Sequence, residues 1–340
     1  MPDVEDPHEV DPLSTDRNDE QREGERPDLA FLKDREIFTQ VPAFSDEPVE
    51  GTIEDLLHRG FMRHAANKTI DQIVDSDDWT VFEAWSLRLA LLLLLGYASM
   101  AANEALTLGD LSSDFYIVKG QNIVPWKLRV LAIRIQAKAF KDHHRAILLY
   151  YSHAIEARKM LRDGHDEYAA YLGELEILVV MSLLELNDFE LAILQLERIP
   201  GDRAKRLTGM IYLQSGSVDE AEKVLSEYSE YSGLLLMSRG QFEEAVGFWE
   251  TQMKSKTKGQ RGYEETCSNL AICQVYTGHL EKAIMTLEKT IPDSSIDQQI
   301  FNLATLYELK GDSSSDSKRQ LLKSVGKKVN TLECYKLPTT

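Results

Sequence analysis

The sequence is poor in the residues and motifs on which most enzymes and secreted proteins depend. It holds three cysteines, Cys267, Cys273 and Cys334, which cannot all pair, so a disulfide framework is excluded and a reducing, cytosolic location is expected. Neither a phosphate-binding glycine-rich loop nor a G-x-S-x-G turn occurs. No basic-then-apolar leader opens the chain, so no signal peptide is expected. We therefore predict a non-enzyme with no catalytic residues, no cofactor and no metal ion.

Positive charge and long apolar runs are also scarce. The 340 residues contain 38 Lys and Arg against 56 Asp and Glu, a net charge of −18. Nucleic-acid-binding proteins usually carry a basic surface, so no nucleic-acid partner is expected. The apolar run from Leu89 to Ala102 is shorter than the roughly 20 residues that span a bilayer. We therefore predict a buried helix there and no direct membrane insertion.

The two ends of the chain differ in charge from its middle. Residues 1–50 hold 16 acidic and 5 basic residues and 6 of the 10 prolines. So acidic and proline-rich a segment buries too little apolar surface to offset its ordering entropy. We predict a disordered acidic tail at 1–47, a helical array at 48–330 and a C-terminal tail at 331–340, with basic residues gathered after Ser317.

A recurring pattern of small residues marks short turns between helices. In most instances a turn residue, usually Gly or Asn, is followed five residues later by Ala and, four residues further on, by an apolar residue; the instance at Gly311 lacks the Ala. A small residue often precedes the turn by seven positions, as Gly209 precedes Gly216. The turn residues fall at 60, 96, 141, 187, 216, 240, 278 and 311.

This pattern predicts pairs of antiparallel helices. The turn needs a residue that adopts positive φ, and small side chains allow the two helices to cross closely. The mean spacing is about 36 residues, near the period of about 34 in tetratricopeptide repeats. The predicted fold is all-α: a right-handed α-solenoid of degenerate tetratricopeptide-like pairs, with an irregular helical bundle as the alternative. We place Tyr150 and Trp249 in the core and leave Trp79, Trp85 and Trp126 undecided.

Two segments interrupt the helices and have two interpretations each. Residues 107–125 contain the apolar run Phe115 to Val118, which either covers the edge of the solenoid or binds a partner. Residues 253–262 form a basic loop, which is either solvated or contacts phosphates or an acidic partner. No other partner-binding residues can be assigned from the sequence, so they stay unknown.

Four segments resemble the subunit 12 family of the TRAPP (transport protein particle) complex. They are EAWSLRLALLLLLGYASMAANEAL, NIVPWKLRVLAI, SNLAICQVYTGHLEKAIMTLEKTI and FNLATLYELKGDSSSDSKRQLLKSV, and the likeness runs in order over about residues 78–328. The repeats near 205–255 are shorter than the family's, which puts a partner surface there in doubt. The resemblance implies a non-catalytic scaffold in a vesicle-tethering complex that activates a Rab GTPase by nucleotide exchange.

That family's role sets the remaining expectations. The resemblance implies action in ER-to-Golgi traffic and autophagy, and contact with other TRAPP subunits, above all the large subunits eight and eleven. It also implies a cytoplasmic protein held peripherally at Golgi or ER–Golgi intermediate membranes. Two alternatives remain: a scaffold of another complex, and a peptide-binding co-chaperone that uses Asn269 and Asn302, which lie 33 residues apart at matching repeat positions. The co-chaperone would also need Lys and Arg in the same groove.

Overall fold

The protein is an all-α chain of paired helices in a computed structural model. The structure describes residues 27–42, 49–77, 80–257, 260, 262–290, 297–311 and 314–325. Within these residues sixteen α-helices follow one another, which confirms the predicted α-solenoid. Their bounds are α1 Ile53–His58, α2 Met62–Val74, α3 Val81–Leu94, α4 Ala98–Ala105, α5 Trp126–Phe140, α6 His143–Arg162, α7 Tyr168–Glu185, α8 Phe189–Leu196, α9 Asp202–Gln214, α10 Val218–Leu225, α11 Ser232–Ser238, α12 Phe242–Ser255, α13 Tyr263–Tyr276, α14 Leu280–Thr290, α15 Asp297–Lys310 and α16 Ser314–Val325.

Short 3-10 helices and one small hairpin complete the described secondary structure. The hairpin pairs two antiparallel strands, β1 and β2, in the loop between α4 and α5. The bounds of these elements are η2 Ala30–Lys33, η3 Arg35–Ile37, η4 Leu106–Leu108, η5 Asp114–Tyr116, η6 Ser229–Tyr231, β1 Ile117–Val118 and β2 Gln121–Asn122.

The helices form eight antiparallel pairs, each with a first and a second helix joined by a tight turn. Every turn position that the sequence pattern predicts has positive φ, between 55° at Lys141 and 111° at Gly311. Lys141 and Asn187 adopt this conformation without being glycine, at φ 55° and 58°. The predicted turns are therefore confirmed, and each one ends the first helix of a pair.

The alanines that follow the turns lie where the two helices of a pair meet. Seven alanines five residues after a turn are all buried: Ala65, Ala101, Ala146, Ala192, Ala221, Ala245 and Ala283. Opposite them the first helix carries small residues that face large ones. A Cβ added at Gly233 would lie 2.5 Å from Phe248 and Trp249, and one at Gly209 would lie 2.4 Å from Leu225. Glycine in these first helices is therefore set by close helix crossing.

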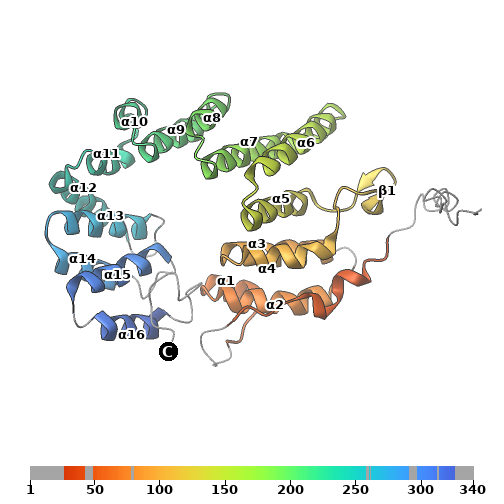
Figure 1. Cartoon of the computed structure of the whole chain (residues 1–340), viewed down its shortest axis with the longest axis horizontal. Coiled ribbons are helices and arrows are strands. Elements are labelled where there is room, and N and C mark those ends of the chain that lie inside the picture. The colour runs from red at the N-terminus through yellow and green to blue at the C-terminus, as the bar shows by residue number, and fades with distance from the viewer. Residues whose placement is uncertain are drawn as a thin grey trace, which may run out of the picture.

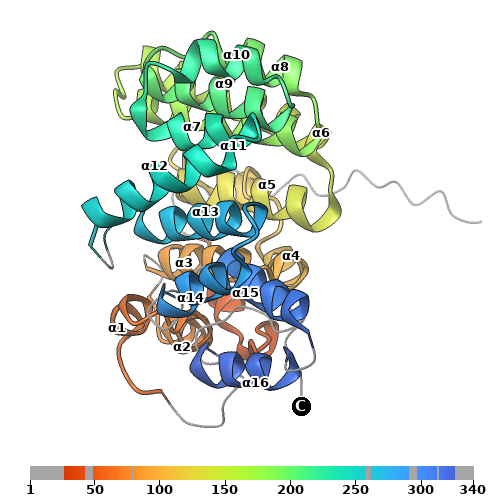
Figure 2. The same cartoon turned by 90° about the vertical axis from the view of Figure 1, so that its left-hand side faces the viewer.

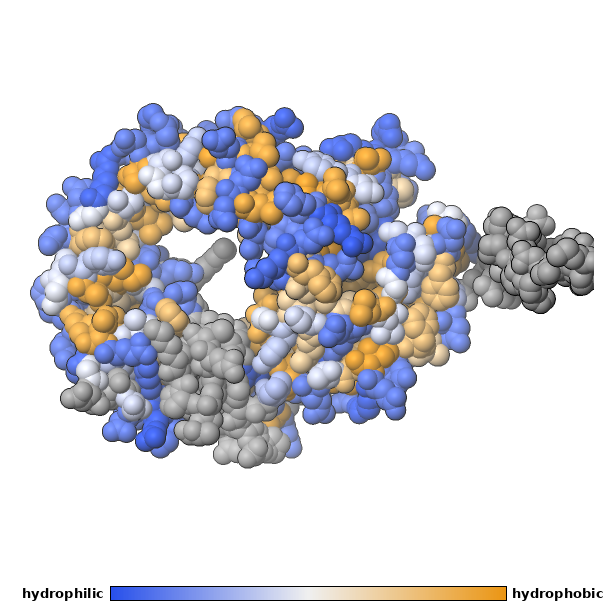
Figure 3. Space-filling model, viewed as in Figure 1, coloured by the Kyte–Doolittle hydropathy of each residue, from blue (hydrophilic) through white to orange (hydrophobic). Residues whose placement is uncertain are grey.

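The eight pairs curve into a ring. The first helices lie along its inner side, and the C-terminal pairs return toward the N-terminal ones (Figure 1). A view turned by 90° places α8 to α10 at one end of the molecule and α1, α2 and α16 at the other (Figure 2). The space-filling view shows an opening through the middle, bordered by hydrophilic and hydrophobic residues side by side (Figure 3). The concave side of the array is thus partly open to solvent.

Part of the expected acidic tail belongs to the folded core. Residues 27–42 contain η2 and η3, and Leu29, Leu32 and Val41 are buried in the same cluster as α2, α3 and α4. The Trp85 indole nitrogen donates a hydrogen bond to the Leu32 carbonyl oxygen at 3.1 Å. The predicted boundary at 47 is therefore wrong for residues 27–42, because three apolar side chains among many acids suffice to anchor them. Residues 1–26 and 43–47, and the tail at 331–340, lie outside the described residues.

A buried ion pair fixes this segment, which we call the N-terminal strap (residues 27–42), to the array. Arg88 and Glu104 are fully buried, with the Arg88 Nε 2.6 Å from Glu104 Oε2. Arg88 also donates to the Thr39 carbonyl at 2.8 Å, and Glu104 accepts from the Thr39 N–H at 3.1 Å. Asn67 accepts from and donates to the backbone of Val41 at 2.7 and 2.9 Å. Each buried charge therefore has several partners, as its desolvation requires.

The loop at 107–125 both covers the core and exposes apolar surface. Tyr116 is buried, and its hydroxyl donates to the Leu108 carbonyl at 2.7 Å. Phe115 and Ile117 point the other way and are 45% and 42% exposed. Phe115 also meets Phe31 of the strap edge-on, with ring centroids 6.0 Å apart. Tyr116 therefore covers the edge of the solenoid, as one of the two interpretations expected, while partner binding by its exposed neighbours stays a prediction.

Other expectations about single residues are settled by burial. Tyr150 and Trp249 are buried as predicted, and Trp85 and Trp126 are buried as well. The apolar run at 89–102 is divided between the end of α3 and the start of α4 by the turn at Gly96, so the prediction of a single buried helix there is wrong. No helix among the described residues is long and apolar enough to cross a membrane. Trp79 lies outside the described residues.

The basic loop predicted at 253–262 is shorter than expected. Helix α12 continues to Ser255, and the Lys256 ammonium bonds to the Gly262 carbonyl at 3.2 Å and to the Thr266 hydroxyl at 3.1 Å. Lys256 therefore ties the loop to α13 instead of being available to phosphates. Lys258 and Arg261 lie outside the described residues.

Candidate functional site

A groove crosses the first helices of four successive pairs. It encloses about 830 Å³ and is lined by residues of α3, α5, α7 and α9 and of the turn before α9. These helices lie on the inner side of the ring (Figure 1). Because it uses equivalent faces of neighbouring pairs, the groove exists only in the assembled array. We call it the inner groove.

Apolar and small side chains form the floor of the inner groove. Leu87 of α3, Leu131 of α5 and Ile177 of α7 are half-buried and line it. Gly173, one turn earlier in α7, is exposed, and a Cβ there would meet nothing within 4 Å. At Gly173 a ligand can therefore approach the backbone of α7 closely.

Cations dominate the rim. Lys127 and Arg134 lie seven residues apart on α5, and therefore on one face, and Arg203 lies near the start of α9. All three are exposed, and none forms an ion pair with a described residue. Glu174 supplies the single acid in the lining. The groove thus carries an excess of positive charge in a chain whose net charge is −18.

A cluster of aromatic residues connects α5 and α7, two of the helices that line the inner groove. Trp126, at the start of α5, stacks on Tyr171 with ring centroids 5.3 Å apart and meets Tyr168 at 5.5 Å. The Arg129 guanidinium lies 5.2 Å from the Trp126 ring and forms two hydrogen bonds of 2.9 Å with Glu156 of α6. These contacts join α5, α6 and α7, so the spacing between the α5 and α7 walls is set by packing.

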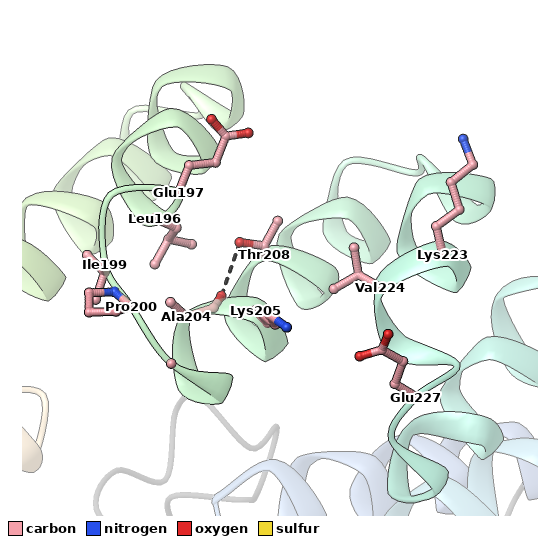
Figure 4. Close-up of a pocket in the computed structure, with 11 residues that line it drawn as sticks. Leu196, Glu197, Ile199, Pro200, Ala204, Lys205, Thr208, Lys223, Val224 and Glu227 are labelled. Atoms are coloured by element: carbon pink, nitrogen blue, oxygen red, sulfur yellow. Dashed lines mark hydrogen bonds between the residues drawn. The ribbon is translucent and has the colours of Figure 1, made fainter.

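A second cavity of about 460 Å³ continues from the inner groove and has a different charge character. It is framed by the end of α8, by α9 and by α10, and shares Ile199, Pro200 and Ala204 with the groove. Thr208 at its centre bonds back to the Ala204 carbonyl at 3.1 Å, and the Lys223 ammonium points away from the other residues (Figure 4).

The charges of this second cavity balance. Its lining holds two lysines, Lys205 and Lys223, and two acids, Glu197 and Glu227, and the Lys223 ammonium is paired with Glu220 at 2.6 Å. Unlike the inner groove, this cavity therefore has no net preference for a ligand of either sign.

Metal-ligand clusters and exposed thiols are both absent from the described parts of the chain. No group of three or more His, Cys, Asp or Glu side chains there could hold a metal ion. Cys267 and Cys273 are buried in α13, and burial raises both thiol pKa values, that of Cys273 to about 11. Such thiols are packed and protonated at neutral pH, in contrast to the low-pKa thiolates of reactive sites.

The residues proposed for a co-chaperone clamp are not brought together with the cations. Asn269 lies on α13 and Asn302 on α15, while Lys127, Arg134 and Arg203 line a groove in the N-terminal half. The Asn302 side chain accepts a hydrogen bond from Gln298 at 3.1 Å. The clamp hypothesis therefore gains no support from the geometry.

The sequence left the partner-binding residues unknown, although it carried a signal for the groove. Small residues at 170 and 173 interrupt an otherwise large-residue helix, and Lys127 and Arg134 are spaced by two helical turns. The pattern of turn residues and alanines predicts the helix pairs, but it does not predict which faces of four separate helices line a common groove. That depends on how successive pairs stack.

The fold and groove together define a class of protein: a tetratricopeptide-like solenoid with an open, basic inner surface. No family model matches the chain. It is 23% identical to trafficking protein particle complex subunit 12 from Homo sapiens over 83% of its own length and 46% of that protein. The Mus musculus subunit 12 is also 23% identical, over 83% of this chain and 42% of the mouse protein. The chain thus spans less than half the length of these curated relatives.

Two solved structures of helical-repeat proteins also match. The APC/C hetero-tetramer Cut9–Hcn1 gives a TM-score of 0.38 at 14% identity, covering 84% of this chain and 54% of the matched chain. The TPR domain of P58(IPK) gives a TM-score of 0.23 at 14% identity, covering 84% and 94%.

Proposed function

We propose that this chain is a non-catalytic scaffold subunit of a TRAPP-type vesicle-tethering complex, which acts by binding other proteins. The observation that carries the proposal is the 23% identity to subunit 12 along 83% of the chain. The described residues form an array of eight helix pairs with an open inner groove. Repeat arrays of this kind offer extended concave surfaces for protein partners.

The partners, cellular process and location that we propose are based on the resemblance between this chain and subunit 12. We propose contact with the other TRAPP subunits, above all the large subunits eight and eleven. The chain would act in ER-to-Golgi traffic and autophagy, in the cytoplasm and peripherally at Golgi or ER–Golgi intermediate membranes. Its link to the Rab GTPase would be indirect, since nucleotide exchange would be carried by other subunits of the complex.

Affinity purification from the source cells tests this proposal. The chain is tagged at its C-terminus at its own locus, isolated at low ionic strength and compared with the tag alone by quantitative mass spectrometry. We expect TRAPP subunits, including eight and eleven, to be enriched together. Enrichment of a different assembly without any TRAPP subunit would contradict the proposal and leave only the solenoid fold.

A further inference from the structure

The inner groove has the shape and charge to hold a particular kind of polypeptide. We propose that it binds an extended, acidic segment of a protein partner, with apolar side chains that alternate with Asp or Glu. This inference rests on the proposed scaffold function and names the chemistry of the partner at one surface. Three features of the groove carry it: the basic rim, the apolar floor and the gap over α7.

The charged residues that line the inner groove indicate a negatively charged ligand. Three exposed cations and one acid line the groove, while the whole chain has a net charge of −18. Charges more than about 8 Å away are largely screened at physiological ionic strength, so the local rim decides what binds. An acidic segment is then attracted at the groove and repelled by most of the remaining surface, which adds positional specificity.

The apolar floor of the inner groove indicates that the ligand also carries apolar side chains. Leu87, Leu131 and Ile177 are half-buried and present apolar surface between the cations, so a purely acidic peptide would leave them uncovered. A chain in the extended conformation directs alternate side chains to opposite sides. Apolar residues can therefore meet the floor while the acids between them reach Lys127, Arg134 and Arg203.

The length of the groove sets the length of the segment. Directly packed helices lie about 8–10 Å apart, and not all four helices of the groove pack on one another, so a path across them is at least about 24–30 Å long. An extended chain needs at least about seven to nine residues to cover this distance. Exposed Gly173 lies on that path and has no side chain to obstruct it, so the peptide backbone can pass close to α7.

Gly173 and Gly247 give a matched pair of variants for the test. Both are exposed glycines inside helices, and a Cβ at either one would meet nothing within 4 Å. Gly173→Trp fills the groove, whereas Gly247→Trp places the same side chain on α12, outside it. A matched pair of charge reversals is Lys127→Glu in the rim and Arg158→Glu on α6; a Glu near the start of α5 is favourable for the helix.

The experiment uses the full chain and fluorescein-labelled twelve-residue peptides that alternate acidic and apolar residues. The probes are one peptide with Glu, one with Gln and one with Lys at the polar positions, measured by fluorescence anisotropy at two salt concentrations. We expect the Glu peptide to bind at least tenfold more tightly than the others and to weaken with salt. Gly173→Trp and Lys127→Glu should each weaken this binding at least tenfold, and Gly247→Trp and Arg158→Glu less than twofold.

Three results would overturn the inference: no binding of the Glu peptide, equal binding of the Gln peptide, or unchanged binding by Gly173→Trp. Circular dichroism and urea unfolding of each variant show that a loss of binding does not come from a loss of fold. Affinity purification of the parent chain separates the two proposals. If the groove inference is wrong but TRAPP subunits still copurify with the parent chain, the scaffold function stands and uses another surface.

Discussion

The N-terminal end of the array and its middle are built from the same kind of helix pair but are held together differently. At the N-terminal end, 23 buried apolar residues from the strap to α5 form one continuous core. Around α10 and α11 the corresponding core has three buried apolar residues, and α10 and α11 have only eight and seven residues. The two regions should therefore differ in how easily they open.

Stability in this solenoid is therefore expected to vary from one helix pair to the next. In a repeat array each pair contacts only its neighbours, so local stability depends on the local interface. The N-terminal end adds contacts from a segment outside the repeats, because the strap brings Leu32 and Thr39 onto α3 and α4. The middle has no such addition and depends on close helix crossing at Gly209 and Gly233. Opening by local unfolding should start in the middle.

The largest effect is expected from removing one member of the buried ion pair. Arg88→Met leaves Glu104 buried without its charged partner, and such a change typically destabilises a protein by about 3–5 kcal/mol. Urea unfolding followed by circular dichroism measures the loss. Hydrogen exchange should place it in the strap and in α2 to α4, with little change in α8 to α11.

The double variant Arg88→Met, Glu104→Leu serves as the control. It should recover part of the loss, because no charge is left buried. Recovery should be incomplete, since Thr39 loses partners for both its N–H and its carbonyl. If Arg88→Met reduced hydrogen-exchange protection equally in all eight pairs, the N-terminal end and the middle of the array would not differ in stability as we expect.

An intermediate effect is expected from Gly233→Ala in the middle. The added methyl group would lie 2.5 Å from Phe248 and Trp249, so the helices must move apart. Overpacking of this kind costs about 1–3 kcal/mol, which outweighs the gain of up to about 1 kcal/mol from better helix propensity. Gly247→Ala, in the second helix of the same pair, should instead stabilise by about 0.5–1 kcal/mol because its Cβ meets nothing. Unfolding curves that shift in the same direction for both variants would rule out close crossing as the reason for Gly233.

The smallest effect that we expect is a dependence of stability on pH through His153, which packs on Trp126. Burial lowers the pKa of His153, and Arg129 lowers it further, against the opposing effect of Glu156. The other group packed on its ring is Trp126, with centroids 5.3 Å apart. The unfolded chain therefore binds the proton more readily, so stability should fall as pH drops below about 6.5.

His153→Gln tests this pH effect. The parent's thermal midpoint should fall more than the variant's between pH 7.5 and pH 5.5, because only the parent has this proton to take up. Identical shifts in the two proteins would show that His153 contributes nothing to acid sensitivity.

The pairing of the helices could be predicted from local sequence features. Residues that tolerate positive φ and small residues at fixed offsets are local requirements, and all eight predicted turn positions have positive φ in the structure. Burial of Ala245 and Trp249 follows from the same offsets. Such features can be predicted because each depends on a few neighbouring residues in the chain.

The positions of the strap and of the inner groove depend instead on contacts between distant parts of the chain. Residues 27–42 look like a tail by composition, yet Arg88, Glu104 and Asn67, from distant helices, bind their backbone. Gly173, Lys127 and Arg203 belong to three different pairs and share a groove because those pairs stack on one another. Both features depend on contacts between residues far apart in sequence, which local periodicity does not encode.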